Sequence, residues 1–343
     1  MNMKSKYIDR IIFISGRNGA RFFLAANSWR EWLRSLEFYR AVTLRAELKK
    51  LAMFLAYPLL KMRAVLSADD VVRIVAEQLK AEIKLPEVDC PAFSAMISPT
   101  GDKAVFHFHG CGYYKVAVGR SLAGVVGELT VYKLLADKCV QSFAFSAVSH
   151  ALISADQVEF FMEYAPGKHF NTHPEAADLL TPLQEFFALA DKQLLPWKQC
   201  WENLALPELS GCLPEDFLQG NTPVGLVHRD FKPWNVKSGA KPLFYDFESV
   251  CWRGCPMEDF FNYIVDPLLR QITPGQVVNA VLKDYRKTAG DMLSKYHLPE
   301  SEFMRYWCWY LLERIAFWRQ HGEAEFAEHF AVMFKLTIQK IES

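Results

Sequence analysis

The chain has 343 residues, of which 51% are hydrophobic and 23% charged, and these proportions exclude a disordered, fibrous or marginally small protein. Its 39 basic and 39 acidic residues cancel, but residues 1–66 hold 13 Lys and Arg against 4 Asp and Glu. The eight cysteines are scattered without a Cys-x-x-Cys pair. We therefore expect reduced thiols in a cytoplasmic protein, and neither a disulfide framework nor a structural zinc site.

Residues 1–88 form the first predicted region. Two short strands around the Gly/Asn turn at residues 16–19 predict a hairpin. Ser28 and Glu31 form a capping box for a helix that we expect to run until Pro58 interrupts it, and Ser67 and Asp70 cap a further helix. The longest apolar run here, residues 51–60, is about half the length that a membrane-spanning helix needs.

The second predicted region, residues 89–162, changes to period two after Pro91. Alternating apolar residues predict three antiparallel strands at 92–98, 104–110 and 113–119, followed by a helix over 121–138 and two more strands. Lys115 is the one charged residue in the third of these apolar strands. Because burying an unpaired ammonium group costs several kcal/mol, roughly, Lys115 should meet a carboxylate or a phosphate.

The third predicted region, residues 163–343, is mainly helical, with one exception at residues 225–250. Here two short apolar runs each end in a polar turn that carries an aspartate, Asp230 in the first and Asp246 in the second. Asp230, Asn235 and Asp246 offer hard oxygen atoms on turns after strands. Such a donor set suits Mg²⁺, which needs only one or two carboxylates besides phosphate oxygens and water.

Two segments of this region resemble a known superfamily. "HRDFKPWN" at 228–235 resembles the catalytic loop of protein-kinase-like enzymes. "YDFESVCWRGCPMED" at 245–259 is similar to the metal-binding segment of the small-molecule branch, which contains the aminoglycoside phosphotransferases and the choline and ethanolamine kinases. The resemblance implies an α+β, bilobal fold with a small antiparallel-sheet N-lobe and a mainly helical C-lobe, here with an additional N-terminal hairpin-plus-helix region.

The resemblance also implies roles for the residues of the two loops. Asp230 would be the base that accepts the proton of the attacking hydroxyl, and Asn235 and Asp246 would bind Mg²⁺. Lys232 either touches the transferred phosphate or is a solvated loop lysine. Glu248 either touches the metal or the substrate, or only shapes the loop. His228 and Asp259 are expected to brace the loop rather than to react.

The nucleotide side of the site is assigned by the same resemblance. Lys115 would hold the α- and β-phosphates of ATP and Glu128 would pair with it, although Glu159 and Glu163 are alternative partners. The turn at 98–103 has one glycine where the family has several, and Ser98 and Thr100 are its candidate phosphate contacts. The hinge between lobes would place backbone groups of Glu163, Tyr164 and Ala165 against the adenine.

The implied activity is an ATP- and Mg²⁺-dependent kinase of a non-protein hydroxyl. The acceptor is expected to be a small molecule or glycoconjugate: a sugar of an envelope glycoconjugate, an amino alcohol or an aminoglycoside. A protein kinase is one alternative, but only twelve residues separate Asp246 from Asp259 and no Asp-Phe-Gly occurs. A nucleotide-binding pseudokinase or membrane-docked scaffold is the other alternative. It predicts loss of the base or of a metal ligand.

The basic N-terminal region has two readings. Residues 28–66 either make a peripheral contact with the anionic inner face of a membrane, or pack on the kinase lobes with their charges solvated. No nucleic-acid partner is expected.

Overall fold

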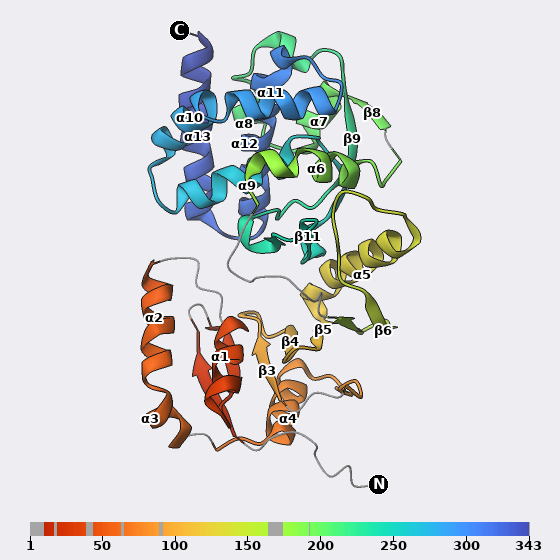
Figure 1. Ribbon diagram of the computed structural model, residues 1–343. Coiled ribbons are helices and arrows are strands. Elements are labelled where there is room, and N and C mark those ends of the chain that lie inside the picture. The colour runs from red at the N-terminus through yellow and green to blue at the C-terminus, as the bar shows by residue number, and fades with distance from the viewer. Residues whose placement is uncertain are drawn as a thin grey trace. The chain divides into compact units, whose positions relative to one another are not determined.

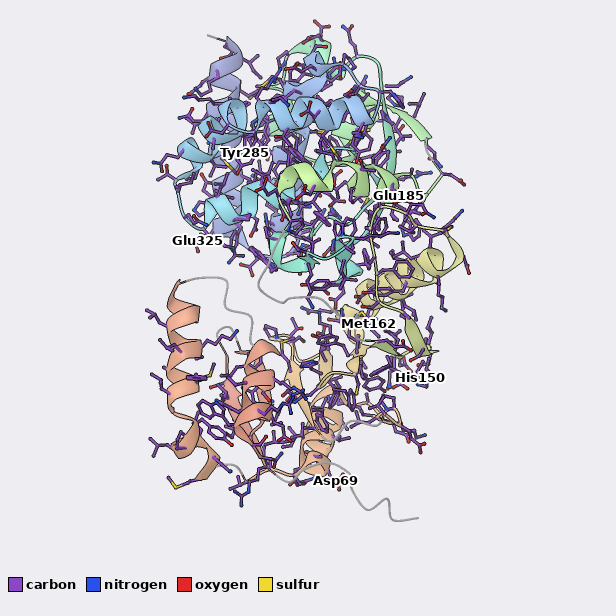
Figure 2. All side chains as sticks on the ribbon, in the orientation of Figure 1. Asp69, His150, Met162, Glu185, Tyr285 and Glu325 are labelled. Atoms are coloured by element: carbon purple, nitrogen blue, oxygen red, sulfur yellow. The ribbon has the colours of Figure 1, made fainter. Side chains whose placement is uncertain are left out.

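The computed structural model describes residues 10–16, 19–38, 44–62, 65–88, 92–163, 174–191 and 193–342. The chain forms two compact units (Figure 1), one from residues 1–139 and 145–170 and the other from 140–144 and 171–343. In Figure 2, His150 and Met162 mark the first unit and Glu185 and Tyr285 the second. Within the described residues, no helix combines the length and the apolar character needed to cross a membrane.

The first unit is built on one antiparallel sheet with the strand order β1-β2-β3-β4-β5-β7-β6. The predicted hairpin and all five strands that follow it along the chain are present. Strand β2 pairs with β3, with Phe22 opposite Met96, so the N-terminal hairpin continues the sheet rather than forming a separate body. The strands are β1 (Ile11–Ser15), β2 (Arg21–Ala25), β3 (Phe93–Ile97), β4 (Lys103–Phe108), β5 (Gly112–Val118), β6 (Val148–Ile153) and β7 (Gln157–Glu163).

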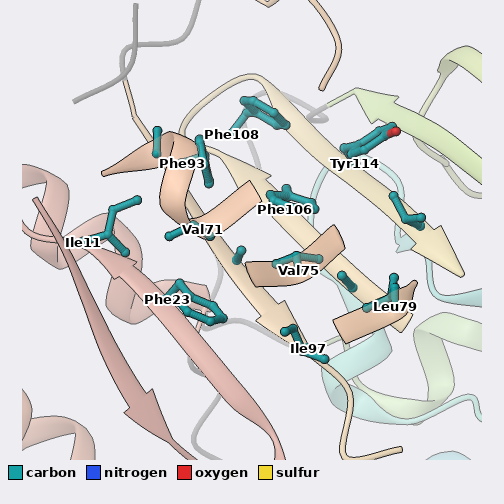
Figure 3. Packing of buried hydrophobic residues seen from close by; sticks show 14 of the residues in the cluster. Ile11, Phe23, Val71, Val75, Leu79, Phe93, Ile97, Phe106, Phe108 and Tyr114 are labelled. Carbon is teal, nitrogen blue, oxygen red and sulfur yellow. The ribbon is translucent and has the colours of Figure 1, made fainter. Parts of the chain in front are cut away.

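Helix α4 (Ala68–Leu79) covers one face of this sheet. Its N-terminus has the predicted capping box, in which the Ser67 hydroxyl accepts from the Asp70 backbone and the Asp70 carboxylate accepts from the Ser67 backbone. Figure 3 shows apolar residues of the helix packing on alternate residues of the strands; the cluster includes Val71, Val75, Leu79, Phe23, Phe93, Phe106, Phe108 and Tyr114. Since side chains alternate along a strand, Lys115 points to the opposite face.

Helices α1 (Trp29–Phe38) and α5 (Leu122–Asp137) pack against strands of the same sheet. The prediction of one continuous helix from Ser28 to Pro58 is wrong, because α1 is followed by the separate helices α2 (Leu44–Leu55) and α3 (Tyr57–Met62). The rings of Trp29 and Phe54 are 4.7 Å apart, whereas one straight helix would separate these residues by about 37 Å. Pro58 lies in the first turn of α3, where its missing N–H costs no hydrogen bond.

The second unit is mainly helical, as predicted, with two small sheets. Strands β8 (Gln193–Pro196), β9 (Asn221–Val227) and β12 (Cys251–Gly254) form one sheet in the order β12-β9-β8, and β10 (Val236–Lys237) and β11 (Leu243–Phe244) form a hairpin. The helices are α6 (Leu180–Phe187), α7 (Trp197–Asn203), α8 (Pro207–Ser210), α9 (Glu258–Leu269), α10 (Pro274–Lys283), α11 (Arg286–Lys295), α12 (Phe303–Gln320) and α13 (Ala324–Glu342).

The aromatic C-terminal segment forms the centre of this unit. Trp307 on α12 is fully buried, and its indole N–H donates to the Thr337 hydroxyl on α13 at 3.0 Å. Tyr306 is bonded to Thr222 on β9 at 2.7 Å between the two hydroxyl oxygens. These contacts fix α12 beside the strand that leads into the loop containing Asp230.

Residues 140–144 are tied to the second unit by hydrogen bonds. The Glu185 carboxylate, labelled in Figure 2, accepts from the backbone N–H groups of Gln141 and Ser142 at 2.7 Å each. The Ala144 N–H donates to the Pro242 carbonyl at 2.7 Å, and the Phe244 N–H donates to the Ala144 carbonyl at 2.9 Å. The segment thus supports β11, which ends directly before Tyr245 and Asp246.

Candidate active site

The two loops of the second unit begin where buried strands end. Val227 is the last residue of β9 and Phe244 the last of β11, and both are buried. Arg229 (φ 65°) and Asp246 (φ 69°) have left-handed backbone conformations. Non-glycine residues in this region cost about 1–3 kcal/mol each and are concentrated at functional sites. Both turns therefore have conformations that the surrounding structure must enforce.

Asp230 is held on both sides of its carboxylate. Its Oδ1 lies 2.6 Å from Lys232 Nζ, and its Oδ2 accepts from Asn235 Nδ2 at 3.0 Å. Asn235 also donates to the Asp230 backbone carbonyl at 2.9 Å. The Asp230 side chain is nevertheless 28% exposed. A carboxylate that is both fixed and accessible has the geometry that a general base requires.

Lys232 connects Asp230 to a second group of side chains that the sequence analysis did not identify. Its ammonium lies 3.6 Å from Asp266 on α9, which also accepts from Arg270 Nε at 3.0 Å. The half-buried rings of Trp234 and Trp318 lie 5.8 and 5.6 Å from Lys232 Nζ. Lys232 is therefore a buried, paired lysine rather than a solvated one. The i, i+4 pair of Asp266 and Arg270 was visible in the sequence, but not its position beside the loop.

The candidate metal ligands follow from the β10–β11 hairpin. Val236 pairs with Phe244 in this hairpin. The Tyr245 N–H donates to the Asn235 carbonyl at 3.4 Å, so Tyr245 lies opposite Asn235, and Asp246 is the next residue along the chain. Asp246 and Glu248 place carboxylate oxygens within 4.8 Å of one another. Two partly exposed carboxylates beside an asparagine amide are donors that suit Mg²⁺.

Asp259, in the first turn of α9, braces the loop that contains Asp230, as expected. Its two oxygens accept from the backbone N–H groups of His228 and Arg229 at 2.7 and 2.8 Å. Burial raises the pKa of Asp259, and these two hydrogen bonds oppose that effect. His228 is buried, and its Nε2 lies 3.0 Å from the Tyr245 carbonyl. His228 thus links the first loop to the second, consistent with a framework role.

A buried charge network behind the loop was not predicted. Glu313 on α12 accepts from Arg229 Nε at 2.7 Å and from Arg314 Nε at 2.5 Å, and Arg314 Nη1 donates to the Arg229 carbonyl at 2.9 Å. Burial alone would raise the pKa of Glu313, but the two guanidinium groups outweigh burial and lower that pKa. The network holds the backbone next to Asp230 from a helix about 80 residues further along the chain.

Glu258 is a second unpredicted buried acid. Its Oε1 accepts from the Cys255 N–H at 2.7 Å and from the Trp309 indole at 3.2 Å. Burial and the neighbouring charge of Glu313 raise the pKa of Glu258 from 4.5 to about 7, against the opposing effect of Arg229 and Arg314. Together with Arg229 and Glu313 it lines a cavity of about 180 Å³.

This raised pKa predicts a pH-dependent stability. Because the folded protein binds the Glu258 proton more tightly than the unfolded chain does, the contribution of Glu258 is complete below pH 4.5 and is lost as the pH rises to about 7. The loss amounts to at most about 3 to 4 kcal/mol, for the difference between 4.5 and about 7 at 1.36 kcal/mol per pKa unit. Urea unfolding at pH 5 and pH 8 should show that Glu258→Gln, which keeps an oxygen acceptor, loses less stability than the wild type over this interval. The exposed control Glu323→Gln should follow the wild type, and identical pH profiles for all three proteins would contradict the assignment.

Lys115 and Glu128 form a buried ion pair in the first unit. Lys115 Nζ lies 2.6 Å from Glu128 Oε2, and the two side chains are 7% and 0% exposed. Glu159 instead accepts from the Tyr114 hydroxyl at 2.6 Å on the other face of the sheet. Glu163 lies exposed at the end of β7. The structure therefore pairs Lys115 with Glu128, the first of the three carboxylates considered.

The other predicted nucleotide contacts are those of the turn at residues 98–103 and of the hinge. The hydroxyls of Ser98 and Thr100 bond to the Asp102 carboxylate, which also accepts from Ser121 at 2.8 Å. Burial would raise the pKa of Asp102, but these hydroxyls outweigh it and lower that pKa. A phosphate contact by Ser98 or Thr100 stays a prediction, as does the hinge. Tyr164 and Ala165 lie outside the described residues.

Comparisons with known proteins identify similar solved structures. No protein-family model matches the chain, and no curated protein matches it. A thermostable mutant of aminoglycoside phosphotransferase APH(4)-Ia, in a ternary complex with AMP-PNP and hygromycin B, is similar over 79% of this chain and 98% of its own, with 14% identity and a TM-score of 0.46.

Two further structures are similar over much of the chain. One is the gentamicin complex of APH(2")-IIa, with 16% identity over 80% of this chain and 98% of that chain, and a TM-score of 0.40. The other is a putative fructosamine-3-kinase from Haemophilus somnus 129PT, with 13% identity over 78% of this chain and 96% of that chain, and a TM-score of 0.39. Because these TM-scores are below 0.5, the fold is assigned from the strands and helices of the two units and not from these structures.

Proposed function

We propose that the protein is an ATP- and Mg²⁺-dependent kinase that phosphorylates a hydroxyl of a non-protein acceptor. The observation that carries the proposal is the arrangement around Asp230: a partly exposed carboxylate held by Lys232 and Asn235, next to a hairpin that presents Asp246 and Glu248. A set of structural turn residues would not need two strained backbone positions, a buried lysine and a buried brace such as Asp259.

The chemistry follows from these positions. Asp230 accepts the proton of the acceptor hydroxyl as the hydroxyl oxygen attacks the γ-phosphorus, and the bond from phosphorus to the β-bridging oxygen breaks. Lys232 is close enough to the base to stabilise charge on the transferred group. Asn235, Asp246 and Glu248 would hold Mg²⁺, which would supply positive charge to neutralise the charge that develops on the phosphates.

Lys115 and Glu128 are proposed to serve the nucleotide phosphates. Lys115→Met removes one charge-assisted contact to the nucleotide, worth about 1.5–3 kcal/mol, so the dissociation constant for ATP should rise roughly 10- to 100-fold. Titration with a fluorescent ATP analogue measures this change, and thermal unfolding shows whether the variant is folded. The exposed control Lys133→Met on α5 should bind as the wild type does. Unchanged affinity in a folded Lys115→Met protein would remove Lys115 from the nucleotide site.

The side chains next to Asp230 support an acceptor with a ring and an acidic group. Trp234 and Trp318 offer aromatic rings, and Lys232 and Arg270, which pair with Asp230 and Asp266, place two cations beside them, with Arg270 Cζ 4.7 Å from the Trp234 ring centroid. Aromatic faces suit the apolar side of a sugar ring, and guanidinium groups suit carboxylates and phosphates. This favours an acidic sugar, such as one in an envelope glycoconjugate, over an amino alcohol or a polycationic aminoglycoside.

Two other functions were considered. A protein kinase needs room for a long activation segment, but only twelve residues separate Asp246 from Asp259, and they include a short 3-10 turn, strand β12 and the first residue of α9. A pseudokinase or scaffold would tolerate loss of the base or of a metal ligand, whereas Asp230, Asn235 and Asp246 are all present.

A screen for acceptor-dependent ATP consumption tests the proposal. Acidic sugars, neutral sugars, amino alcohols and aminoglycosides are supplied one class at a time, with Mg²⁺ and then with excess EDTA. The expected result is ADP formation that needs one class of acceptor and is abolished by EDTA. ATP that is bound but transferred to no acceptor of any class would favour the scaffold.

A further inference from the structure

Helices α2 and α3 present an apolar face to solvent. Leu48, Leu51, Leu55, Leu59 and Met62, here called the α2–α3 apolar face, are between 53% and 75% exposed. The positions repeat every three or four residues, so at 3.6 residues per turn they lie on one side. The hydrogen bonds from Ala56 to Ala52 and from Leu60 to Ala56 carry this register from α2 into α3. Exposed apolar surface of this extent marks an interaction site.

The opposite side of the same helices is already packed. Met53 and Tyr57 are 8% and 7% exposed and belong to a cluster with Ile12, Leu24, Trp32 and Leu36. Trp29 packs edge-on against Phe54 and Tyr57, with ring centroids 4.7 and 4.8 Å away. The helices are therefore anchored to the first unit by one apolar side, and the exposed leucines are a second apolar side that this packing does not need.

The charges around the apolar face identify its partner. Residues 48–62 contain Lys49, Lys50 and Lys61 and no acidic residue, within a segment of 66 residues that has 13 basic and 4 acidic side chains. At 100° per residue, Lys49 falls about 120° from the centre of the leucine stripe on one side, and Lys50 and Lys61 fall about 120° to 140° from that centre on the other side. Lysines beside a short apolar helix face extend their ammonium groups to lipid headgroups while the leucines enter the acyl boundary.

We propose that the α2–α3 apolar face docks the protein on an anionic lipid bilayer. The helices lie in the plane of the interface, with Leu51, Leu55 and Leu59 entering the bilayer and Lys49, Lys50 and Lys61 contacting headgroup phosphates. This peripheral contact is independent of the kinase chemistry, because its residues belong to neither the Asp230 loop nor the Lys115 pair. It would bring the enzyme to lipid-linked acceptors.

Co-sedimentation of the full-length protein with vesicles tests the docking site. Without nucleotide, the protein should bind vesicles of phosphatidylcholine and phosphatidylglycerol at low salt at least tenfold more tightly than vesicles of phosphatidylcholine alone, and high salt should weaken that preference. The triple variant Leu51→Glu, Leu55→Glu, Leu59→Glu should bind anionic vesicles at least tenfold more weakly. The double variant Lys50→Gln, Lys61→Gln should reduce the preference for anionic lipid.

The control places the same change on equally exposed leucines elsewhere. Leu194 is 68% exposed, as Leu55 is, and Leu152 is 52% exposed. The double variant Leu152→Glu, Leu194→Glu should bind as the wild type does, and circular dichroism checks that all variants are folded. Absence of wild-type binding at low salt overturns the proposal. A second result would also overturn it: the wild type is a dimer in light scattering, the triple variant is a monomer, and the two bind vesicles equally well. The face would then join two copies of the chain.

Discussion

Replacing Asp230 with Asn should lower phosphotransfer about a thousandfold, because general-base catalysis contributes typically 10²- to 10⁴-fold. The amide can still fill the space between Lys232 and Asn235, but it cannot accept the proton of the attacking hydroxyl. ATP affinity should change little, since the base acts on the acceptor. Transfer to the acceptor found in the screen is measured by coupled ADP release, and nucleotide affinity by titration.

The control for this substitution is Asp284→Asn, which changes an exposed aspartate in the same unit. Its transfer rate should equal that of the wild type. If Asp230→Asn binds ATP and transfers phosphate at the wild-type rate, Asp230 is not the base and the proposed mechanism is wrong. If transfer and ATP affinity fall together, Asp230 acts through the nucleotide rather than on the acceptor hydroxyl.

Glu313→Gln should destabilise the protein by about 3–5 kcal/mol, the typical cost of removing one partner from a buried ion pair. Glu313 is 3% exposed and lies within 2.5 Å of a nitrogen on each of Arg229 and Arg314. Replacing its charge leaves the Arg314 guanidinium, which is 1% exposed, without its main compensating charge. Urea unfolding at pH 7 measures the loss as a lower midpoint.

Two comparisons make the Glu313 result specific. Glu323→Gln, an exposed change in the turn after α12, should shift the free energy of unfolding by less than about 0.5 kcal/mol. The double variant Arg229→Gln, Glu313→Gln should cost less than the sum of the two single changes, because both remove the same interaction. A loss below about 1 kcal/mol for Glu313→Gln would show that the network contributes little to stability.

Much of the local structure was predictable, because it depends on residues close together in the chain. Alternating apolar residues predicted β3, β4 and β5, and the apolar run that ends before His228 predicted a strand followed by a polar loop. The Ser67–Asp70 capping box formed as expected, since its partners are three residues apart. The prediction of a single long helix from Ser28 is wrong, because apolar periodicity alone does not distinguish one continuous helix from two helices, α1 and α2, of which one carries Trp29 against Phe54 of the other.

The sequence by itself determined the candidates for chemistry: an aspartate proposed as the base, oxygen donors on adjacent turns and one lysine in an apolar strand. Only the tertiary structure decided their partners. Lys115 met Glu128 rather than Glu159 because the pleat turns Lys115 and Glu159 to opposite faces of the sheet. Lys232 met Asp266, and Arg229 met Glu313, across separations that no local pattern encodes. Pairing over such distances depends on how strands and helices pack, whereas residue type and spacing describe only what each loop can offer.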